Sequence, residues 1–299
     1  MHNHTRRLMN TVFAMLLLFF ATCAKSPPSD HQESTISIAS FNLLHLGWDN
    51  GKDLNTLARV IARYDVVALQ EVMNLDTLQR LKSILDTLTG IRWNAIASSQ
   101  KIGRTSYKEY YAIVFRSDRT TYVQQSASVW ADSLDEFERE PFYASFRSGN
   151  FDYTLIVMHS DFDSRKEVMR REARALKNVF NVIQDLDPHE NDLILVGDFN
   201  LCADDTGWVS LKGLPTMTHF IACSTLTTIN ARGNLTSSYD NIWIQASYTG
   251  REYSGTSGVD YYYTTLLKDE GQPARAARQK ISDHLPVYAL FITNKEDDD

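Results

Sequence analysis

The chain has 299 residues, of which 43% are apolar and 22% charged, and this balance excludes a disordered or fibrous protein. Its net charge is −7, and without the early Arg6, Arg7 and Lys25 it has 27 basic and 37 acidic residues, a net charge of −10. An acidic protein that acts on polyanions must offset its own charge with a local basic patch or bound metal ions, so the composition excludes a general nucleic-acid coat.

The first 24 residues have the pattern of an export signal. Two arginines precede the apolar run 12–21, which is about half as long as the roughly 20 residues a membrane span needs. We therefore predict a signal peptide over 1–24 and an exported protein. Cys23 stands where a bacterial lipoprotein signal places its lipidated cysteine, and simple cleavage after Ala24 fits as well. The mature protein is thus expected to be secreted, or tethered by lipid to a bacterial cell envelope.

The remaining chain is expected to form one folded unit. The polar, proline-bearing stretch 25–34 suits a flexible tether, and 295–299 form an acidic tail. Between them, 35–294 contain no linker or repeat. Because α/β domains run to about 250 residues as one unit, we expect a single domain, monomeric and without an obligate protein partner.

Short apolar runs typical of strands alternate with helical patterns along this domain. The first strand is expected over 36–42, and the clearest helical period lies in 163–185. Further helices are expected over 53–62 and 75–88, and further strands over 66–71, 110–116, 121–126, 142–146, 153–158, 192–196, 241–245 and 287–292. Strands outnumber helices, which favours an α/β sandwich of two packed sheets with helices outside.

Several strands end on polar side chains, which cost free energy at a buried edge unless they meet partners there. Asn42, Glu71, His159 and Asp240 each close an apolar or aromatic run. The strand 192–196 runs into Gly197–Asn200, where residues two apart share a face of the extended chain. The carboxylate and amide of this segment could hold a metal, a water and a phosphate oxygen, and a plain Asp/Asn turn is the other interpretation.

Directly before the last strand stands Ser282-Asp283-His284. Histidine gives and takes protons near neutral pH, so this segment is a candidate for acid–base chemistry. A lone Asp-His pair is usually structural, but the polar residues at the other strand ends strengthen the interpretation that this pair belongs to a functional site.

Six short motifs follow one another along the domain: Phe41-Asn42, Leu69–Val72, His159-Ser160, Gly197–Asn200, Tyr239-Asp240 and Ser282–His284. Their order resembles that of the endonuclease/exonuclease/phosphatase superfamily. The segments 103–111 and 137–142 further resemble its deoxyribonuclease I branch. The resemblance implies a four-layer α/β/β/α sandwich of two packed, largely antiparallel sheets with outer helices. It also implies a phosphodiesterase.

By this resemblance the catalytic residues are Glu109, His159, Asp198, Asn200, Asp240 and His284. Glu109 would support His159, and Asp240 would support His284, because an imidazole that transfers protons needs a carboxylate to fix its tautomer. Asn42, Glu71 and Asp283 are expected to hold Mg²⁺ or Mn²⁺. Tyr107 and Arg139 are expected to bind substrate, with the arginine clamping a phosphate oxygen, and a surface ion pair of Arg139 with Glu140 is the competing interpretation.

The resemblance also implies two stabilising features. A structural Ca²⁺ would bind Asp132, Asp135, the carbonyl of Phe137 and Glu140, although an acidic loop is often only solvated. The disulfide of the branch lacks its second cysteine, where Ser237 stands, so Cys202 would pair with Cys223 or remain free.

We therefore predict an endonuclease that depends on a divalent metal, hydrolyses DNA by in-line attack of water and leaves 5′-phosphate ends. Met73 stands where the branch places a minor-groove arginine, so duplex binding is expected to be weaker or differently arranged. One alternative is a phospholipid phosphodiesterase similar to the bacterial sphingomyelinases, which need an exposed apolar hairpin, whereas the stretch 128–134 is acidic. Another is a catalytically inactive binding protein, which the complete set of competent residues disfavours.

Overall fold

The computed structural model describes residues 34–162, 166–186 and 191–296. The expected signal peptide, nearly all of the tether and the last residues of the acidic tail lie outside these ranges. No helix in the described ranges has the length and apolar character that a membrane crossing requires.

One sheet has six strands in the order β12-β13-β1-β2-β4-β3. Their bounds are Tyr253–Val259 for β12, Val287–Ile292 for β13, Thr35–Leu46 for β1, Val66–Val72 for β2, Tyr110–Arg116 for β4 and Trp93–Ala97 for β3. Only β1 and β2 run parallel in this sheet, and the other neighbours are antiparallel.

The other sheet has the order β10-β11-β9-β8-β7-β5, and β6 pairs with β7. The bounds are Met217–His219 for β10, Asp240–Gln245 for β11, Leu193–Asp198 for β9, Phe151–His159 for β8, Phe142–Ser148 for β7, Thr121–Tyr122 for β5 and Ser128–Val129 for β6. Here β8 and β9 form the parallel pair. Each sheet of the described chain thus contains one parallel pair, and the carboxyl ends of a parallel pair lie at one sheet edge.

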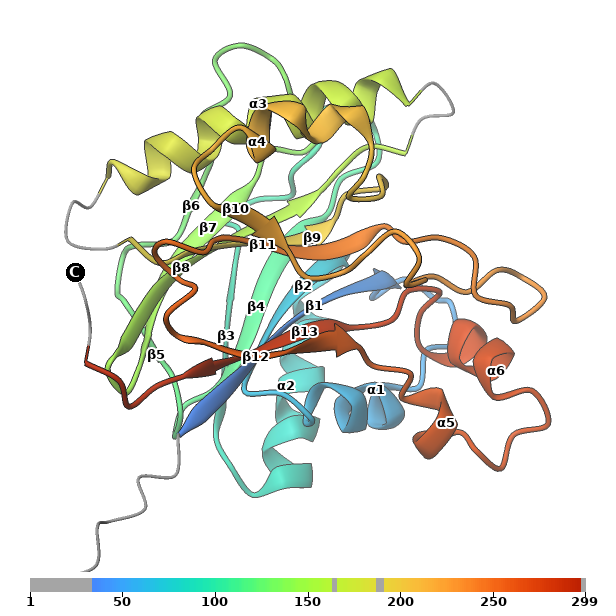
Figure 1. The fold of residues 1–299 in the computed structure, drawn as a ribbon. Helices are drawn as coiled ribbons and strands as arrows, with labels where there is room; N and C mark the ends of the chain where they lie inside the picture. The colour runs from blue at the N-terminus through green and yellow to red at the C-terminus, as the bar shows by residue number, and fades with distance from the viewer. Residues whose placement is uncertain (1–33, 163–165, 187–190, 297–299) are drawn as a thin grey trace, which may run out of the picture. The chain divides into compact units, whose positions relative to one another are not determined.

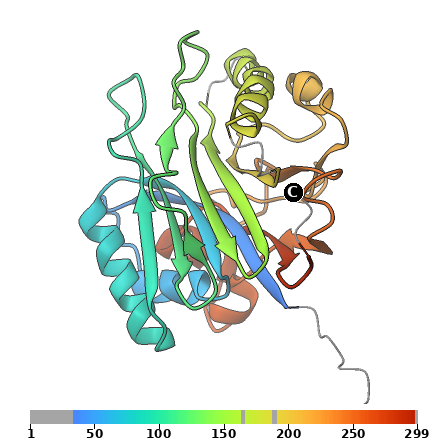
Figure 2. The ribbon, with the colours of Figure 1, turned by 90° about the vertical axis from the view of Figure 1, so that its left-hand side faces the viewer.

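The two sheets pack face to face, and helices cover their outer faces (Figures 1 and 2). On the six-stranded sheet lie α1 (Leu54–Ile61), α2 (Leu75–Thr89), α5 (Tyr263–Leu266) and α6 (Pro273–Lys280). On the other lie α3 (Glu167–Gln184), the short 3-10 helix η1 (Thr206–Trp208) and α4 (Val209–Lys212). The expected four-layer α/β/β/α sandwich is confirmed.

Local sequence explains where the predicted helices begin. The side chain of Asp53 accepts hydrogen bonds from the backbone nitrogens of Asn55 and Thr56 and so caps α1. Asn74 caps α2 in the same way, and Gly90 ends that helix with a φ of 68°. The apolar face of α3 is buried against the sheet, as its period predicts.

One predicted strand is shorter than expected. The run 121–126 is strand only over Thr121–Tyr122. The φ of Gln125 is +68°, which a continuing strand does not allow, and Ser126 donates its backbone N–H to the carbonyl of Val123 in a tight turn. The sheet edge therefore ends at this turn.

Candidate active site

Polar side chains near the carboxyl ends of both parallel pairs meet between the sheets. Asn42 of β1 donates from Nδ2 to Glu71 Oε1 at 3.0 Å and to Asp198 Oδ2 at 3.0 Å. Because Glu71 belongs to β2 and Asp198 to β9, this one amide links the carboxylates of the two sheets. All three residues are buried.

Gly197 lets β9 approach β8 closely enough to align the two strand ends. In the parallel register Gly197 is opposite Met158, and His159 is opposite Asp198. A Cβ atom at Gly197 would lie 1.9 Å from the carbonyl oxygen of Met158, and its φ is +156°. Only glycine fits this position, which explains the residue that begins the Gly197–Asn200 motif.

His159 is held by Glu109 from the neighbouring sheet. Its Nδ1 lies 2.9 and 3.0 Å from the two carboxylate oxygens, and its backbone N–H donates to the hydroxyl of Tyr111 at 2.9 Å. Burial disfavours the charged imidazole, but Glu109 and then Asp198 outweigh it, so the pKa of His159 is raised. The expected pairing of Glu109 with His159 is present in the structure.

His284 is held in the same manner by Asp240. Its Nδ1 lies 3.1 and 2.9 Å from the two oxygens of Asp240, which also accepts from the hydroxyl of Thr227 at 2.6 Å. Burial again opposes the charged ring, yet Asp240, Asp198 and Asp283 together raise the pKa of His284 well above its ordinary value. The buried imidazole of His159 and the partly buried imidazole of His284 thus each have a dedicated carboxylate.

The free nitrogens of both imidazoles face one oxygen atom. The Nε2 of His159 is 3.7 Å from Asp198 Oδ2, and the Nε2 of His284 is 3.4 Å from the same atom. Burial raises the pKa of Asp198, but the two imidazoles and its hydrogen bonds lower it overall. Asp198 is therefore a carboxylate at neutral pH, placed between two groups that can exchange protons.

Backbone contacts fix the remaining predicted residues around this centre. Asn200 donates its backbone N–H to Asp198 Oδ1 at 3.0 Å and its side-chain N–H to the carbonyl of Ser160 at 3.0 Å. The hydroxyl of Ser282 donates to the carbonyl of Asn42 at 2.7 Å, which ties the segment before β13 to β1. A cleft of about 370 Å³ opens over the assembled residues.

Arg139 does not lie on the surface, so the competing interpretation of a surface ion pair is wrong. It is buried, and it donates from Nε to the carbonyl of His159 at 3.1 Å and from Nη2 to the carbonyl of Ser160 at 2.9 Å. Its guanidinium also lies over the ring of Tyr107, 5.6 Å from the centroid. In this arrangement Arg139 positions the end of β8, and a phosphate clamp would have to use its remaining nitrogen.

The oxygen atoms at one side of the cleft fit a hard divalent cation. Oδ1 of Asp283 is buried and has no hydrogen-bond partner among the described residues. Glu71 lines the same cleft as Asp283 from the end of β2, and it has a φ of +57°, which few residues other than glycine adopt. An unpaired buried carboxylate oxygen and a second carboxylate in one cleft are oxygen donors of the kind that Mg²⁺ or Mn²⁺ takes. The oxygen of Asn42 instead accepts from the backbone N–H of Leu44, so Asn42 supports the site through its nitrogen.

Three cationic or titratable side chains at this site had no signal in the sequence. His45 contacts Glu71 through Nε2 at 3.1 Å, and Arg278 pairs with Asp283 at 2.5 Å. Burial lowers the pKa of Lys52 to about 8, against the opposing influence of Asp283 and Glu71. Lys52 and Arg278 add positive charge beside these carboxylates. The three residues lie at the end of β1, in the loop before α1 and on α6, outside every motif.

An arginine side chain pairs with the acidic residues of the segment expected to bind calcium. Nη2 of Arg104 lies 2.8 Å from a carboxylate oxygen of Asp132 and 2.8 Å from one of Asp135, and Nη1 donates to the carbonyl of Asp135. The same oxygen of Asp132 accepts the backbone N–H of Phe137. Among the described residues, Asp132, Asp135 and Glu140 do not gather as a group of metal-ligand atoms, and Arg104 pairs with the first two while Glu140 lines a separate surface pocket, so the expected Ca²⁺ site does not assemble.

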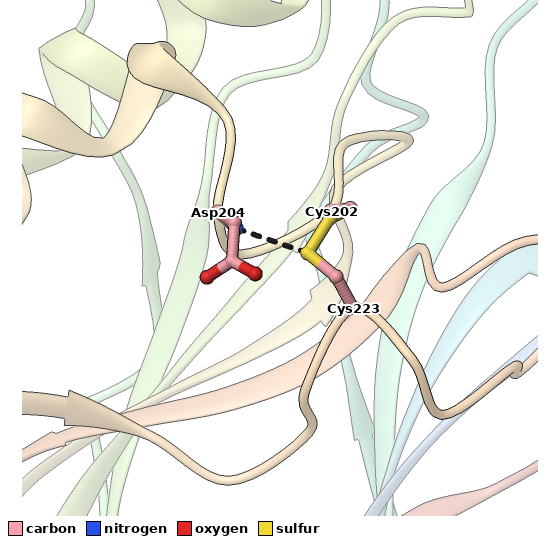
Figure 3. Close-up of side chains that lie close together, drawn as sticks. All are labelled: Cys202, Asp204 and Cys223. Carbon is pink, nitrogen blue, oxygen red and sulfur yellow. Dashed lines mark hydrogen bonds between the residues drawn. A yellow bond between two sulfur atoms is a disulfide. The ribbon is translucent and has the colours of Figure 1, made fainter.

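Cys202 and Cys223 form a disulfide, and Figure 3 shows Asp204 beside it. The backbone N–H of Asp204 donates to Cys223 Sγ at 3.1 Å. The two sulfurs and the carboxylate of Asp204 are close enough to suggest a metal site. Metals bind thiolates, however, so the bonded sulfurs leave no such site.

Comparisons with known proteins point to one family. A model described as "Endonuclease/Exonuclease/phosphatase family" matches residues 39–284. A protein named deoxyribonuclease from Thioalkalivibrio sp. (strain K90mix) is 33% identical over 96% of this chain and 77% of its own length. Deoxyribonuclease-1-like 1 of Mus musculus is 30% identical over 78% of this chain and 72% of its own length. The crystal structure of an endonuclease/exonuclease/phosphatase from Bacteroides vulgatus superposes with a TM-score of 0.58 at 15% identity, covering 87% of this chain and 99% of that one.

Proposed function

The chain belongs to the endonuclease/exonuclease/phosphatase family, in its deoxyribonuclease I branch, and we propose that this hydrolase is an exported, metal-dependent endonuclease that cuts DNA to 5′-phosphate ends. One observation carries the proposal: the Nε2 atoms of His159 and His284 face the same oxygen of Asp198, at 3.7 and 3.4 Å. Each imidazole has its own carboxylate partner, and both Nε2 atoms face the same point. This arrangement suits a reaction in which one histidine accepts a proton from the attacking water and the other donates a proton to the leaving oxygen.

The residues of the chain account for both proton transfers. One imidazole accepts a proton from the attacking water as its oxygen bonds to phosphorus, and the other gives a proton to the 3′ oxygen as the P–O3′ bond breaks. Glu109 and Asp240 keep each Nδ1 protonated, so that each Nε2 faces the substrate. Asp198 stabilises the imidazolium that forms and, with Asn200, orients the water and the phosphate oxygens.

Nucleases of this family use divalent metals, and Glu71 and Asp283 are the residues that would hold one here. Such an ion, when bound, neutralises negative charge that develops on the phosphate. Asn42 keeps Glu71 and Asp198 in place by bonding to both. Lys52 and Arg278 offset the charge of the same carboxylates.

DNA is the substrate supported by the names of the relatives, which are deoxyribonucleases. Export is supported by the pattern of residues 1–24, and 25–34 would then tether the domain 35–294 at a distance from the envelope if Cys23 carries lipid. Mass spectrometry of the mature N-terminus tests this part. A mass for Cys23 with a lipid, or for a chain that begins at Lys25, supports export, and an intact Met1 in the cell envelope fraction contradicts it.

A nicking assay tests the proposed chemistry. The mature chain is incubated with supercoiled plasmid and Mg²⁺, with and without chelator, and new ends are examined for a 5′ phosphate. We expect nicking that the chelator abolishes and that both His159→Ala and His284→Ala reduce at least a thousandfold. His219→Ala is the matched control, because His219 packs on Trp243 of β11 outside the site. Cleavage of sphingomyelin but not plasmid, or unchanged nicking by either histidine variant, contradicts the proposal.

A further inference from the structure

An aromatic cluster lies beside the metal-binding side of the cleft. His45 and Trp48 stack with their centroids 4.0 Å apart and their planes at 12°, and Tyr107 meets both rings edge-on, at 5.6 and 6.2 Å. We call His45, Trp48 and Tyr107 the aromatic platform. None of the six motifs contains His45 or Trp48, and the chemistry proposed above does not use them.

The platform is joined directly to a residue of the reaction centre. His45 contacts Glu71 Oε2 with its backbone N–H at 3.0 Å and with its Nε2 at 3.1 Å. At the other end, the guanidinium of Arg139 lies over the ring of Tyr107. The platform therefore extends outward from the reaction centre, and a nucleotide next to the scissile phosphate would reach it.

The backbone holds the platform rigidly. Leu44 and His45 both adopt the left-handed conformation, with φ values of 45° and 64°. Trp48 donates its backbone N–H to the carbonyl of His45, and the side chain of Asn50 donates to the carbonyls of Leu44 and His45 at 3.1 Å. Non-glycine residues in this conformation cost free energy and persist only where the surroundings fix them, so the backbone of His45 is well defined, and the stack on His45 orients the indole of Trp48.

Trp48 nevertheless keeps half of its surface, 50%, in solvent. A flat, exposed indole oriented by a neighbouring ring is the kind of surface on which an unpaired nucleobase stacks, because every base has an aromatic face. Bases inside a duplex are already stacked on one another and cannot offer that face. Met73, at the position expected for a minor-groove arginine, is 5% exposed and so offers no alternative contact to a duplex.

We infer that the aromatic platform stacks an unpaired base next to the scissile phosphate, and that the enzyme therefore favours single-stranded over duplex DNA. This inference rests on the proposed function and adds the substrate form to it. Trp48 is the residue that sets the preference, while His45 links the indole to Glu71.

The test compares one oligonucleotide as a single strand and as a blunt duplex, with Mg²⁺. We expect Trp48→Ala to lower kcat/KM on the single strand about tenfold and on the duplex less than twofold, and Trp48→Phe to retain most activity. The loss should disappear on a strand with an abasic site beside the scissile phosphate, which a merely structural role of Trp48 would not cause. Tyr248→Ala removes another exposed aromatic ring and should leave kcat/KM unchanged on both the single strand and the duplex.

Equal losses on both substrates, or no loss on the single strand, would overturn the inference while leaving the proposed function intact. Wild-type protein that cleaves neither DNA nor bis(4-nitrophenyl) phosphate with Mg²⁺ would overturn both. The small phosphodiester has no base, so its hydrolysis reports the chemistry without the platform.

Discussion

Asp240→Asn removes the charge that supports His284 without changing the size of the side chain. In the structure a carboxylate oxygen of Asp240 lies 2.9 Å from Nδ1 of His284, and Asp240 is buried while the imidazole is partly buried. Two unit charges at that distance attract by about 6 kcal/mol at an effective dielectric constant of about 20, which equals about four powers of ten in imidazolium population. Asp198 and Asp283 remain near the ring, so we expect a smaller net effect.

We expect Asp240→Asn to lower kcat about a thousandfold at pH 7, because the amide can also donate to Nδ1 and so favour the wrong tautomer. The pH limb that reports protonated His284 should move to lower pH, since Asp240 raises the pKa of that imidazole. The assay is cleavage of a fluorescent oligonucleotide from pH 5 to 9, with circular dichroism to verify folding. Asp205→Asn, which removes a carboxylate paired with Arg170 outside the site, is the control. A folded Asp240→Asn protein within tenfold of wild type, with the same pH profile, would refute the reasoning.

Three further predictions concern stability, measured by denaturant unfolding. Gly197→Ala should cost about 3 kcal/mol or prevent folding, because its Cβ would meet the carbonyl of Met158, and a wild-type midpoint would contradict this. Burial raises the pKa of Glu172 from 4.5 to about 7, so the folded state binds the carboxyl proton of Glu172 more tightly than the unfolded state does. The free energy of unfolding should therefore fall by about 3 kcal/mol as pH rises from about 4.5 to 7. Glu172→Gln should flatten that slope, and an unchanged slope would assign it to other groups. The double variant Cys202→Ser with Cys223→Ser should lower the free energy of unfolding by about 3 kcal/mol, because the disulfide closes a loop of 21 positions. Its stability should no longer depend on reductant. Equal stability of the wild-type protein and the double variant would contradict this.

The interior strands that carry site residues were predictable because they are buried on both faces. Val66–Val72 and Leu193–Asp198 are apolar runs with polar residues at or near their carboxyl ends, and their predicted bounds differ from the observed ones by at most two positions. By contrast, Tyr253–Val259 was not predicted. It lies at a sheet edge, is partly exposed, and contains small polar residues and two glycines, so it lacks the apolar alternation that identifies a strand.

Residues of the site were predictable only where a motif indicated both the residue type and its position at the end of a strand. His159 and Asp198 stand at strand ends, and the topology of parallel pairs brings such ends together. Arg104 lies in a loop, and His45 lies near the end of β1 with a φ of 64°, so local backbone conformation and not periodicity sets their partners. Arg104 meets Asp132 across 28 positions, and nothing in the local sequence of either residue predicts that it takes the place expected for calcium.

The hydrogen bond from Ser282 to the carbonyl of Asn42 joins positions that are 240 residues apart. A growing polypeptide therefore cannot assemble its reaction centre until the segment before β13 has been synthesised and has docked on β1. Any fragment that ends before this segment lacks His284 and the contact that fixes it, so shortened products of the gene would be harmless to the cell that makes them. We therefore expect hydrolytic activity to require the last strand, and a proteolytic cut that releases this strand to abolish it.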